Sequence, residues 1–331
     1  MRAARARAPV RLDFAGGWTD VPPFSAREGG AVVSAAIALY AEAEVRPGGT
    51  GIRLEAEDLG RVMELAGPDD LAGAGDLALH RAALRLFPPD GPLTLATRCG
   101  APIGAGLGSS GAVDVALVAA LARASGRTLA PLEAAERGWR LEAVEAGVAG
   151  GKQDQYSAAL GGFNLFRFRD PEVEVEPLRL RPEFAAELAR RIVLCYTGAS
   201  HFSGTTISRV MAAYERGSGP VVSALRGLGE VAHRMALALR AEDLERVGAL
   251  LAENWAHQTA LDPAMATPEM RRLEAAMRTA GALGGKAAGS GAGGCMFFLV
   301  GGDPARACEA AVAAGARVLP VAWDTTGVRA W

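Results

Sequence analysis

A glycine-rich stretch at residues 102–112, PIGAGLGSSGA, constrains this chain most strongly. Its alternate glycines remove side chains where backbone N–H groups must converge, and an apolar, Ala-rich segment follows directly. Ser109 and Ser110 stand where a helix would begin, and its unpaired N–H groups and dipole favour an anion. The stretch is neither a Walker A loop, which ends in Gly-Lys-Ser/Thr, nor a G-x-G-x-x-G pattern in its proper strand context. We interpret it as another kind of phosphate-binding loop; a flexible turn before a buried helix is the alternative.

The overall composition excludes several classes of partner. The chain has 331 residues, 50% of them hydrophobic, which allows two domains with well-buried cores. A formal net charge of -2 provides no basic surface for nucleic acid or an anionic membrane. No apolar run approaches the length of about 20 residues that spans a bilayer. The four cysteines show no disulfide or zinc spacing. We expect a cytoplasmic protein, monomeric or homodimeric, that binds a small molecule.

The first informative stretch in chain order is residues 7–20. Apolar side chains alternate there with Arg11 and Asp13, as in a half-buried strand, and two glycines then end the strand. An indole, a hydroxyl and a carboxylate follow at residues 18–20. These groups beside two glycines suit a polyhydroxylated ligand, because a carboxylate accepts two hydroxyl hydrogen bonds and glycines permit close approach. An ordinary turn with a solvated Asp20 is the alternative.

The remaining hydrophobic patterns predict a mixed α+β protein. Strands are expected at residues 29–45, 52–57, 93–99, 161–168, 191–198, 296–300 and 317–323. Helices are expected at residues 69–87, 110–125, 130–147, 219–239, 241–259, 267–281 and 303–314, and a loop at 201–206. The charged, proline-interrupted stretch 170–182 suggests a junction, so we predict one domain over residues 1–182 and a second over 183–331.

Two further clusters carry polar groups or glycine. Lys152 and Asp154 lie two residues apart after two glycines, which would place a carboxylate against a substrate hydroxyl and an ammonium near phosphate oxygens. A polar helix start with a solvated ion pair is the alternative. Residues 284–295 form a second glycine-rich stretch, which suggests two halves of the molecule closing on one anion. A hairpin linker is the alternative there.

Residues 8–20, 102–110 and 286–294 together resemble, in order and spacing, the three signature motifs of the GHMP small-molecule kinases. The resemblance spans nearly the whole chain. It implies a two-domain α+β fold with ATP and substrate in the cleft between the domains. Residues 151–156 and the chain length look most like the sugar 1-kinases that act on D-glycero-D-manno-heptose 7-phosphate.

The resemblance leaves the sugar open. The Gly-Gly-Trp-Thr-Asp stretch is closer to the L-fucose kinases, because heptose kinases more commonly carry a third glycine where Trp18 stands. Heptose kinases also usually have an arginine near His201, whereas here the first arginine after Gly198 is Arg209. Residues 151–156 favour transfer to the anomeric hydroxyl of a heptose 7-phosphate-type sugar, with free L-fucose as the alternative. A related decarboxylase and a non-catalytic sugar and ATP sensor are further alternatives; residues 151–156 argue against the first, and the presence of Asp154 against the second.

The resemblance also implies a role for each matched residue. Asp154 would orient or deprotonate the acceptor hydroxyl, and Lys152 and Arg11 would balance the charge around it. The ATP-binding residues would be Gly104, Ala105, Gly106, Leu107, Gly108, Ser109 and Ser110. The substrate-binding residues would be Gly16, Gly17, Trp18, Thr19, Asp20, Gly289, Ser290 and Gly291.

The expected cofactors are ATP and Mg²⁺. Ser110 and Glu142 would be the Mg²⁺ ligands, since both offer the hard oxygen donors that this ion prefers. Glu145 lies one helical turn after Glu142 and is the alternative ligand.

Overall fold

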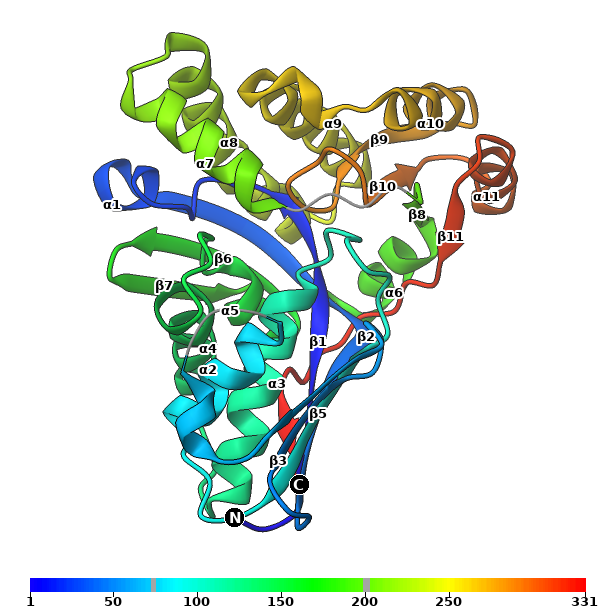
Figure 1. Ribbon diagram of the computed structural model, residues 1–331. Helices are drawn as coiled ribbons and strands as arrows, with labels where there is room; N and C mark the ends of the chain where they lie inside the picture. The colour runs from blue at the N-terminus through cyan, green and yellow to red at the C-terminus, as the bar shows by residue number, and fades with distance from the viewer. Residues whose placement is uncertain (73–75, 199–202) are drawn as a thin grey trace.

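The computed structural model describes residues 1–72, 76–198 and 203–331, which form two sheets with their covering helices (Figure 1). Among the described residues, the larger sheet has eight strands, with β12-β1-β2-β5-β3-β4 in order and β6 and β7 extending from β2. These strands are β1 (Ala4–Ala15), β2 (Gly30–Pro47), β3 (Ile52–Ala56), β4 (Arg61–Leu65), β5 (Leu93–Cys99), β6 (Phe163–Arg169), β7 (Glu172–Pro177) and β12 (Arg329–Ala330). The smaller sheet has the order β11-β8-β10-β9 and contains β8 (Ile192–Tyr196), β9 (Ala282–Ala287), β10 (Cys295–Val300) and β11 (Arg317–Leu319).

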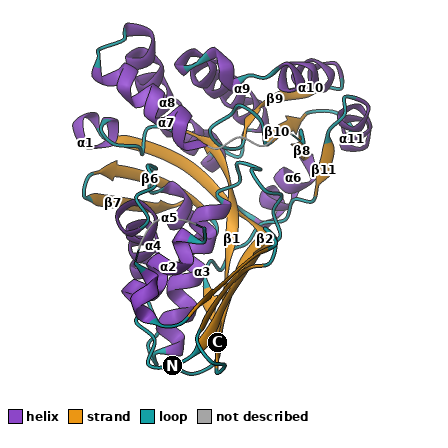
Figure 2. Cartoon of the chain, viewed as in Figure 1, coloured by secondary structure: helices purple, strands orange, loops and turns teal. Residues whose placement is uncertain are grey.

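Helices surround both sheets, and this mixed content confirms the predicted α+β class. The helices of the first half are α1 (Phe24–Glu28), α2 (Ala78–Leu86), α3 (Ser109–Ala124), α4 (Pro131–Arg140) and α5 (Gln153–Leu160). Those of the second half are α6 (Pro182–Arg191), α7 (Ser203–Glu215), α8 (Gly219–Arg240), α9 (Leu244–Leu261), α10 (Pro268–Thr279) and α11 (Pro304–Ala313). Figure 2 shows α2 to α5 gathered beside the larger sheet, with α8 to α11 above it. None of the helices in the described part of the chain has the length and apolarity needed to cross a bilayer.

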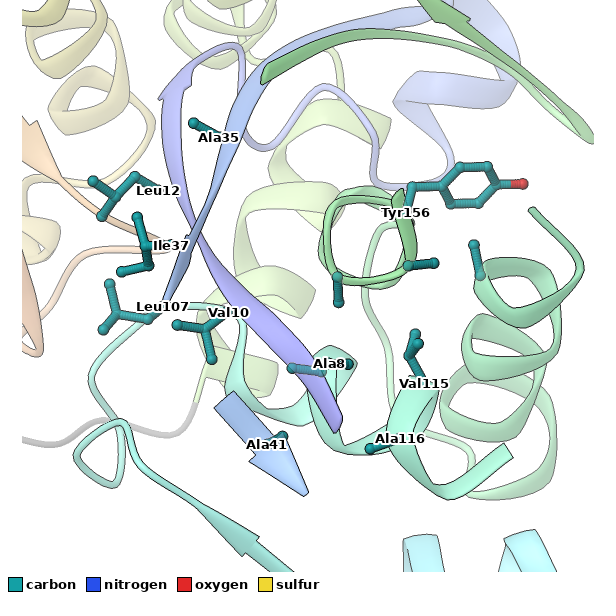
Figure 3. Close-up of a cluster of buried hydrophobic side chains, with 14 of the residues drawn as sticks. Ala8, Val10, Leu12, Ala35, Ile37, Ala41, Leu107, Val115, Ala116 and Tyr156 are labelled. Atoms are coloured by element: carbon teal, nitrogen blue, oxygen red, sulfur yellow. The ribbon is translucent and has the colours of Figure 1, made fainter. Parts of the chain in front are cut away.

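The core of the first half lies between α3 and the long antiparallel pair β1 and β2. Nearly every residue of α3 is buried, which is the pattern of a helix enclosed on all sides. Its many alanines let the helix backbone approach the sheet closely. Figure 3 shows this packing, with Ala8 of β1 and Ala41 of β2 on the side of Val115 and Ala116 of α3, and Val10 beside Leu107 and Ile37.

The prediction that β1 is half-buried is wrong, because both faces of its second half are covered. Val10 and Leu12 point into the core, while Arg11 and Asp13 are only 5% and 3% exposed. These two charged side chains are covered by the second half of the molecule, where Arg11 contacts Ala288 and Asp13 contacts Lys286. The strand therefore lies at the junction between the two sheets.

Several elements differ from the sequence prediction. The stretch 170–182 contains β7, which pairs with β6 as a hairpin and so belongs to the larger sheet. The loop predicted at residues 201–206 is wrong from Ser203 onward, where α7 begins, and His201 lies outside the described residues. The helix predicted over 69–87 begins only at Ala78, after a short 3-10 turn at Pro68–Leu71.

The end of the chain returns to the larger sheet. After β11, Trp323 forms a bridge with Ile37 and packs its ring against Phe163. The strand β12 then pairs antiparallel with β1, so the two termini lie near each other in Figure 1. The boundary at residue 182 stays a prediction, but the last residues of the predicted second domain pair with strands of the first.

Candidate active site

A cavity of about 470 Å³ lies where the glycine-rich loops, β1 and the start of α5 meet. Most of the predicted site residues line it. They are Arg11, Gly17, Trp18, Asp20, Gly104, Ala105, Gly106, Gly108, Ser109, Ser110, Glu142, Asp154, Gly289 and Ser290. Five predicted residues are absent from the lining, namely Gly16, Thr19, Leu107, Lys152 and Gly291.

The loop that precedes α3 presents backbone rather than charged side chains to the cavity. Gly104, Gly106 and Gly108 have φ values of 67°, 71° and 73°, in the left-handed region that favours glycine. Gly108 is the residue immediately before α3, so the free N–H groups of that 16-residue helix begin at Ser109. The side chain of Leu107 is fully buried in the core, so only the backbone of this residue belongs to the loop surface. The loop has the geometry of an anion site at a helix N-terminus.

The second glycine-rich loop closes directly on the first. A Cβ on Gly289 would lie 2.5 Å from the carbonyl oxygen of Gly106, so only glycine permits this approach. Gln258 fixes the loop from α9 by donating to the carbonyl of Gly289 at 2.7 Å. Gly291, with φ of 81°, instead packs against Met265 and does not reach the cavity, which corrects its prediction as a substrate contact.

Arg11 and Asp154 form an ion pair between the two loops. Arg11 Nη2 lies 2.8 Å from Asp154 Oδ1, and Arg11 Nε donates to the same oxygen at 2.9 Å. Arg11 Nη1 donates to the carbonyls of Gly106 and Ala288, at 2.7 and 2.9 Å. A Cβ on Gly108 would lie 3.2 Å from Asp154 Oδ2, so the carboxylate lies directly against the glycine-rich loop that precedes α3. One arginine thus ties both loops to the carboxylate of α5.

Asp20 is a second carboxylate in the cavity and is held by Gln153. The backbone N–H of Gln153 donates to Asp20 Oδ2 at 3.0 Å, and its side-chain amide donates to Oδ1 at 3.1 Å. Burial raises the pKa of Asp20 to about 6, although the Gln153 N–H opposes the shift, and the charges of Asp154 and Asp13 add to it. A Cβ on Gly151 would lie 1.9 Å from Asp20 Oδ2, so the glycine makes room for this carboxylate.

The residues around Asp20 divide between the cavity and the interior. Trp18 lines the cavity, is 5% exposed and packs into a hydrophobic cluster with Phe24. Thr19 is fully buried, and its hydroxyl donates to the carbonyl of Gly16 at 2.7 Å and accepts from the N–H of Ala31 at 3.0 Å. Gly16 and Thr19 therefore stabilise the turn, which corrects their prediction as substrate contacts.

The structure contradicts the predicted catalytic position of Lys152. Its Nζ lies 3.1 Å from Asp170 Oδ1, donates to the carbonyl of Pro171 at 2.9 Å and sits 4.4 Å from the ring centroid of Trp139. The ammonium is buried in that pocket and does not line the cavity. Its sequence neighbour Asp154 faces the cavity because adjacent residues at the start of α5 point in different directions.

Glu142 lies on a single π turn, Leu141–Glu145, that continues from α4. Its carboxylate lines the cavity, accepts from Gln155 Nε2 at 2.6 Å and receives a hydrogen bond from Ser110. Burial raises the pKa of Glu142, and the Ser110 hydroxyl opposes that shift. Glu145 does not line the cavity. The Ser110 and Glu142 oxygens fit Mg²⁺, which proteins usually hold through one or two side chains together with phosphate oxygens.

Five residues in or beside the site were given no role from the sequence. Gln153 and Gln155 flank Asp154, and each supports a neighbouring carboxylate. Gln155 also donates to Asp114, whose pKa burial raises well above its ordinary value. Asp13 lines the cavity, and Lys286 is its buried partner. The two glutamines lie within the predicted cluster, and Asp13 and Lys286 lie within the first and third motif stretches, whereas nothing local marked Asp114.

Comparisons with known proteins indicate a kinase, the class of protein that the residues of this cavity also suit. Residues 76–162 match the GHMP kinases N terminal domain, and residues 235–317 match the GHMP kinases C terminal domain. D-glycero-alpha-D-manno-heptose 7-phosphate kinase of Campylobacter jejuni is 29% identical over 313 residues, which cover 92% of this chain and 91% of that protein. The bifunctional fucokinase/GDP-fucose pyrophosphorylase of Arabidopsis thaliana is 27% identical over 79% of this chain, but only 26% of its own length is matched.

One solved structure has a similar fold over nearly the full length of both chains. The D-glycero-D-manno-heptose 1-phosphate kinase from Bacteroides thetaiotaomicron superposes with a TM-score of 0.78 at 27% identity, covering 99% of this chain and 98% of that one. The fold and the cavity define a small-molecule kinase. The chain belongs to the GHMP kinases, which use ATP as the phosphoryl donor, and the predicted family is confirmed.

Proposed function

We propose that this protein transfers the γ-phosphoryl group of ATP to the anomeric hydroxyl of a heptose 7-phosphate-type sugar. One observation carries the proposal: Arg11 holds Asp154 against the glycine-rich loop, in a cavity whose other end contains buried carboxylates. Two relatives with names of heptose kinases, each matched over more than 90% of its length, support the choice of sugar.

The donor end of the cavity binds the triphosphate. Backbone N–H groups of the loop and the first turn of α3 contact the phosphate oxygens. Ser110 and Glu142 hold Mg²⁺, which when bound neutralises charge on those oxygens. Gly289 and Ser290 cover the transferred group from the opposite side, where the second loop already contacts the first.

Asp154 acts on the acceptor hydroxyl. Since its Oδ1 is held by Arg11, the carboxylate is fixed in orientation beside Gly108, where the acceptor and the γ-phosphate must meet. It accepts the hydrogen bond of the attacking hydroxyl and takes its proton as the new P–O bond forms and the bond from the γ-phosphorus to the β,γ-bridging oxygen breaks, which releases ADP. Because such transition states are loose, orientation contributes more than full deprotonation before attack.

Asp20 binds ring hydroxyls at the acceptor end. Gln153 fixes both of its oxygens, so the carboxylate offers a rigid pair of acceptors, and Trp18 provides an apolar wall beside it. A site that hydrogen-bonds hydroxyls rejects analogues without them far more strongly than an apolar pocket rejects a missing methylene. Deoxy sugars are therefore poor substrates.

Free L-fucose is the second candidate, favoured by the tryptophan after the diglycine and by the partial match to a plant fucokinase. A non-catalytic sensor is disfavoured by the intact Arg11–Asp154 pair.

Turnover of ATP with a sugar panel tests the proposal. The panel contains D-glycero-D-manno-heptose 7-phosphate, L-fucose, D-galactose and mevalonate, and ³¹P NMR identifies the product. We expect the heptose phosphate to give the highest kcat/KM and a new phosphate signal coupled to the anomeric proton. Coupling to a CH₂ group, or preference for L-fucose, would overturn the assignment. ATP and sugar binding without any turnover would instead indicate a sensor.

A further inference from the structure

Asp13 is a third carboxylate in the wall of the cavity, in addition to Asp20 and Asp154. It belongs to β1 and is 3% exposed. Its Oδ2 lies 3.0 Å from Nζ of Lys286, which also donates to the Asp13 carbonyl at 2.7 Å. Its Oδ1 is buried and has no hydrogen-bond partner within the described residues. A buried carboxylate oxygen without a partner costs free energy, so this atom requires an explanation.

The surroundings of Asp13 supply a cation but no second donor. Lys286 is fully buried on β9 and crosses from the smaller sheet to reach this carboxylate. Gly17 lies beside it, and a Cβ there would be 2.1 Å from Asp13 Oδ2. The glycine thus makes room for the oxygen that Lys286 holds, and Asp13 lines the cavity together with Arg11 and Asp20. A ligand that fills the cavity is one source of the donor that Oδ1 lacks.

We propose that Asp13 is a second substrate-binding carboxylate, whose Oδ1 accepts a hydrogen bond from a sugar hydroxyl different from the one that Asp20 binds. The proposal rests on the proposed function, since it requires a polyhydroxylated acceptor in this cavity. Lys286 is a positioning residue, because it fixes Asp13 from the smaller sheet and touches no substrate. Two carboxylates at fixed separation then select the relative arrangement of two hydroxyls on the ring.

An alternative explanation is that Asp13 serves only as the counter-ion of buried Lys286 and stabilises the contact between the two sheets. The two explanations differ in their dependence on the substrate. If Asp13 binds one sugar hydroxyl, replacing Asp13 has no effect on an analogue that already lacks this hydroxyl. A structural defect instead lowers activity towards every sugar by the same factor.

A cycle of variants and substrates separates the two. The kcat/KM values of wild type and Asp13→Asn are measured with heptose 7-phosphate and its 2-deoxy, 3-deoxy and 4-deoxy analogues. We expect Asp13→Asn to lower kcat/KM for the parent sugar roughly 10- to 100-fold, the range for a hydrogen bond to a charged group. For one deoxy analogue the variant and wild type should agree within about twofold, and the KM for ATP should stay unchanged. Equal losses for all four sugars would overturn the proposal.

The chain offers a control in a second lysine–aspartate pair, in which the lysine is buried and the aspartate partly buried. Asp170 contacts Lys152 outside the cavity, so Asp170→Asn makes the same chemical change away from the substrate. It should show no dependence on which hydroxyl is missing. If Asp13→Asn does not fold, the double variant Asp13→Asn/Lys286→Gln removes both charges and enters the same cycle.

A measurement on variants that retain Asp13 gives an independent answer. Asp20→Asn should lose its sensitivity to one deoxy position and keep sensitivity to another. Loss of sensitivity at every position would leave no second carboxylate contact and would overturn the proposal. If the panel shows turnover of L-fucose and not of the heptose phosphate, the heptose assignment fails, and the same cycle is run with L-fucose and its monodeoxy analogues. If Asp13→Asn lowers kcat/KM by the same factor for L-fucose and for each of its analogues, the proposed role of Asp13 fails, whereas the sugar kinase activity itself stands.

Discussion

The two ends of the cavity are lined by different chemical groups. At the donor end, residues 104–110 carry no ionisable side chain and offer backbone N–H groups. At the acceptor end, Asp13 and Asp20 bring negative charge into a site with little access to water. The first end attracts an anion with dipoles, and the second repels an anion and accepts hydrogen bonds from hydroxyls. The donor end is thus suited to phosphate oxygens, and the acceptor end to hydroxyl groups.

Asp154 lies between these ends, and its removal should have the largest effect. Asp154→Asn keeps the shape of the side chain but removes the charge that Arg11 neutralises. We expect kcat to fall roughly 10²- to 10⁴-fold, the usual range for a positioned acid or base, with the KM for ATP nearly unchanged. Steady-state kinetics measure both. A variant that keeps more than half of the wild-type kcat would remove Asp154 from the mechanism.

The acceptor end is tested next by Asp20→Ala. Loss of the carboxylate removes charge-assisted hydrogen bonds and leaves sugar hydroxyls unpaired, which should cost about 2–4 kcal/mol in kcat/KM for the sugar. The KM for ATP should not change, because Asp20 belongs to the other end. Equal changes in the KM for ATP and for the sugar would break the distinction between the two ends.

The buried state of Asp20 also predicts a dependence of stability on pH. Burial raises its pKa to about 6 in the folded protein, against 3.8 for an ordinary aspartate. Between these values the folded state holds a proton that the unfolded state has lost, so this group's contribution to the free energy of unfolding falls as pH rises. It should fall by about 2 kcal/mol between pH 4 and 7. Urea unfolding of wild type and Asp20→Asn at several pH values measures the difference between their slopes, and parallel slopes would contradict the shift.

The proposed metal ligand Glu142 provides a test of the donor end of the cavity. Glu142→Gln should raise the Mg²⁺ concentration for half-maximal activity by about tenfold or more, since even outer ligands change metal affinity that much. Glu145→Gln is the control, because its side chain does not line the cavity. A shift with Glu145→Gln and none with Glu142→Gln would transfer the role to Glu145.

The smallest effect on catalysis is expected for Lys152→Met. The ammonium contacts Asp170 and Pro171 outside the cavity, so kcat should stay within about twofold of wild type. The free energy of unfolding should instead fall by on the order of 1–3 kcal/mol, because the partly buried carboxylate of Asp170 loses its cation and keeps only the hydrogen bond from Ser25. A large loss of kcat in a stable variant would restore the catalytic role that the sequence suggested.

The same division explains what the sequence could predict. The donor loop was recognisable because glycines with positive φ and a helix start are local features, and Gly104 to Ser110 occupy the expected place. The acceptor end depends on contacts between segments far apart in the chain, such as Asp13 with Lys286. The alternation in β1 suggested a solvated face for Asp13, since no local pattern reveals that a second sheet covers it.

Proximity in sequence was also misleading within one cluster. Lys152 and Asp154 are two residues apart, yet one side chain faces Asp170 and the other faces the cavity. The helix α7 was not predicted, although Ile207, Val210, Met211 and Tyr214 follow helical spacing and pack in one cluster.

The pairing of β12 with β1 has a consequence for how the protein folds during its synthesis. The register joins Ala6 to Ala330, so the larger sheet cannot be completed until almost the whole described sequence has been translated. At about 5–20 residues per second, the intervening chain takes about 15–65 s to synthesise. Throughout that time one edge of β1 has no strand beside it, and an uncovered edge invites pairing with other chains. A chaperone that shields nascent chains would therefore have most to protect at β1.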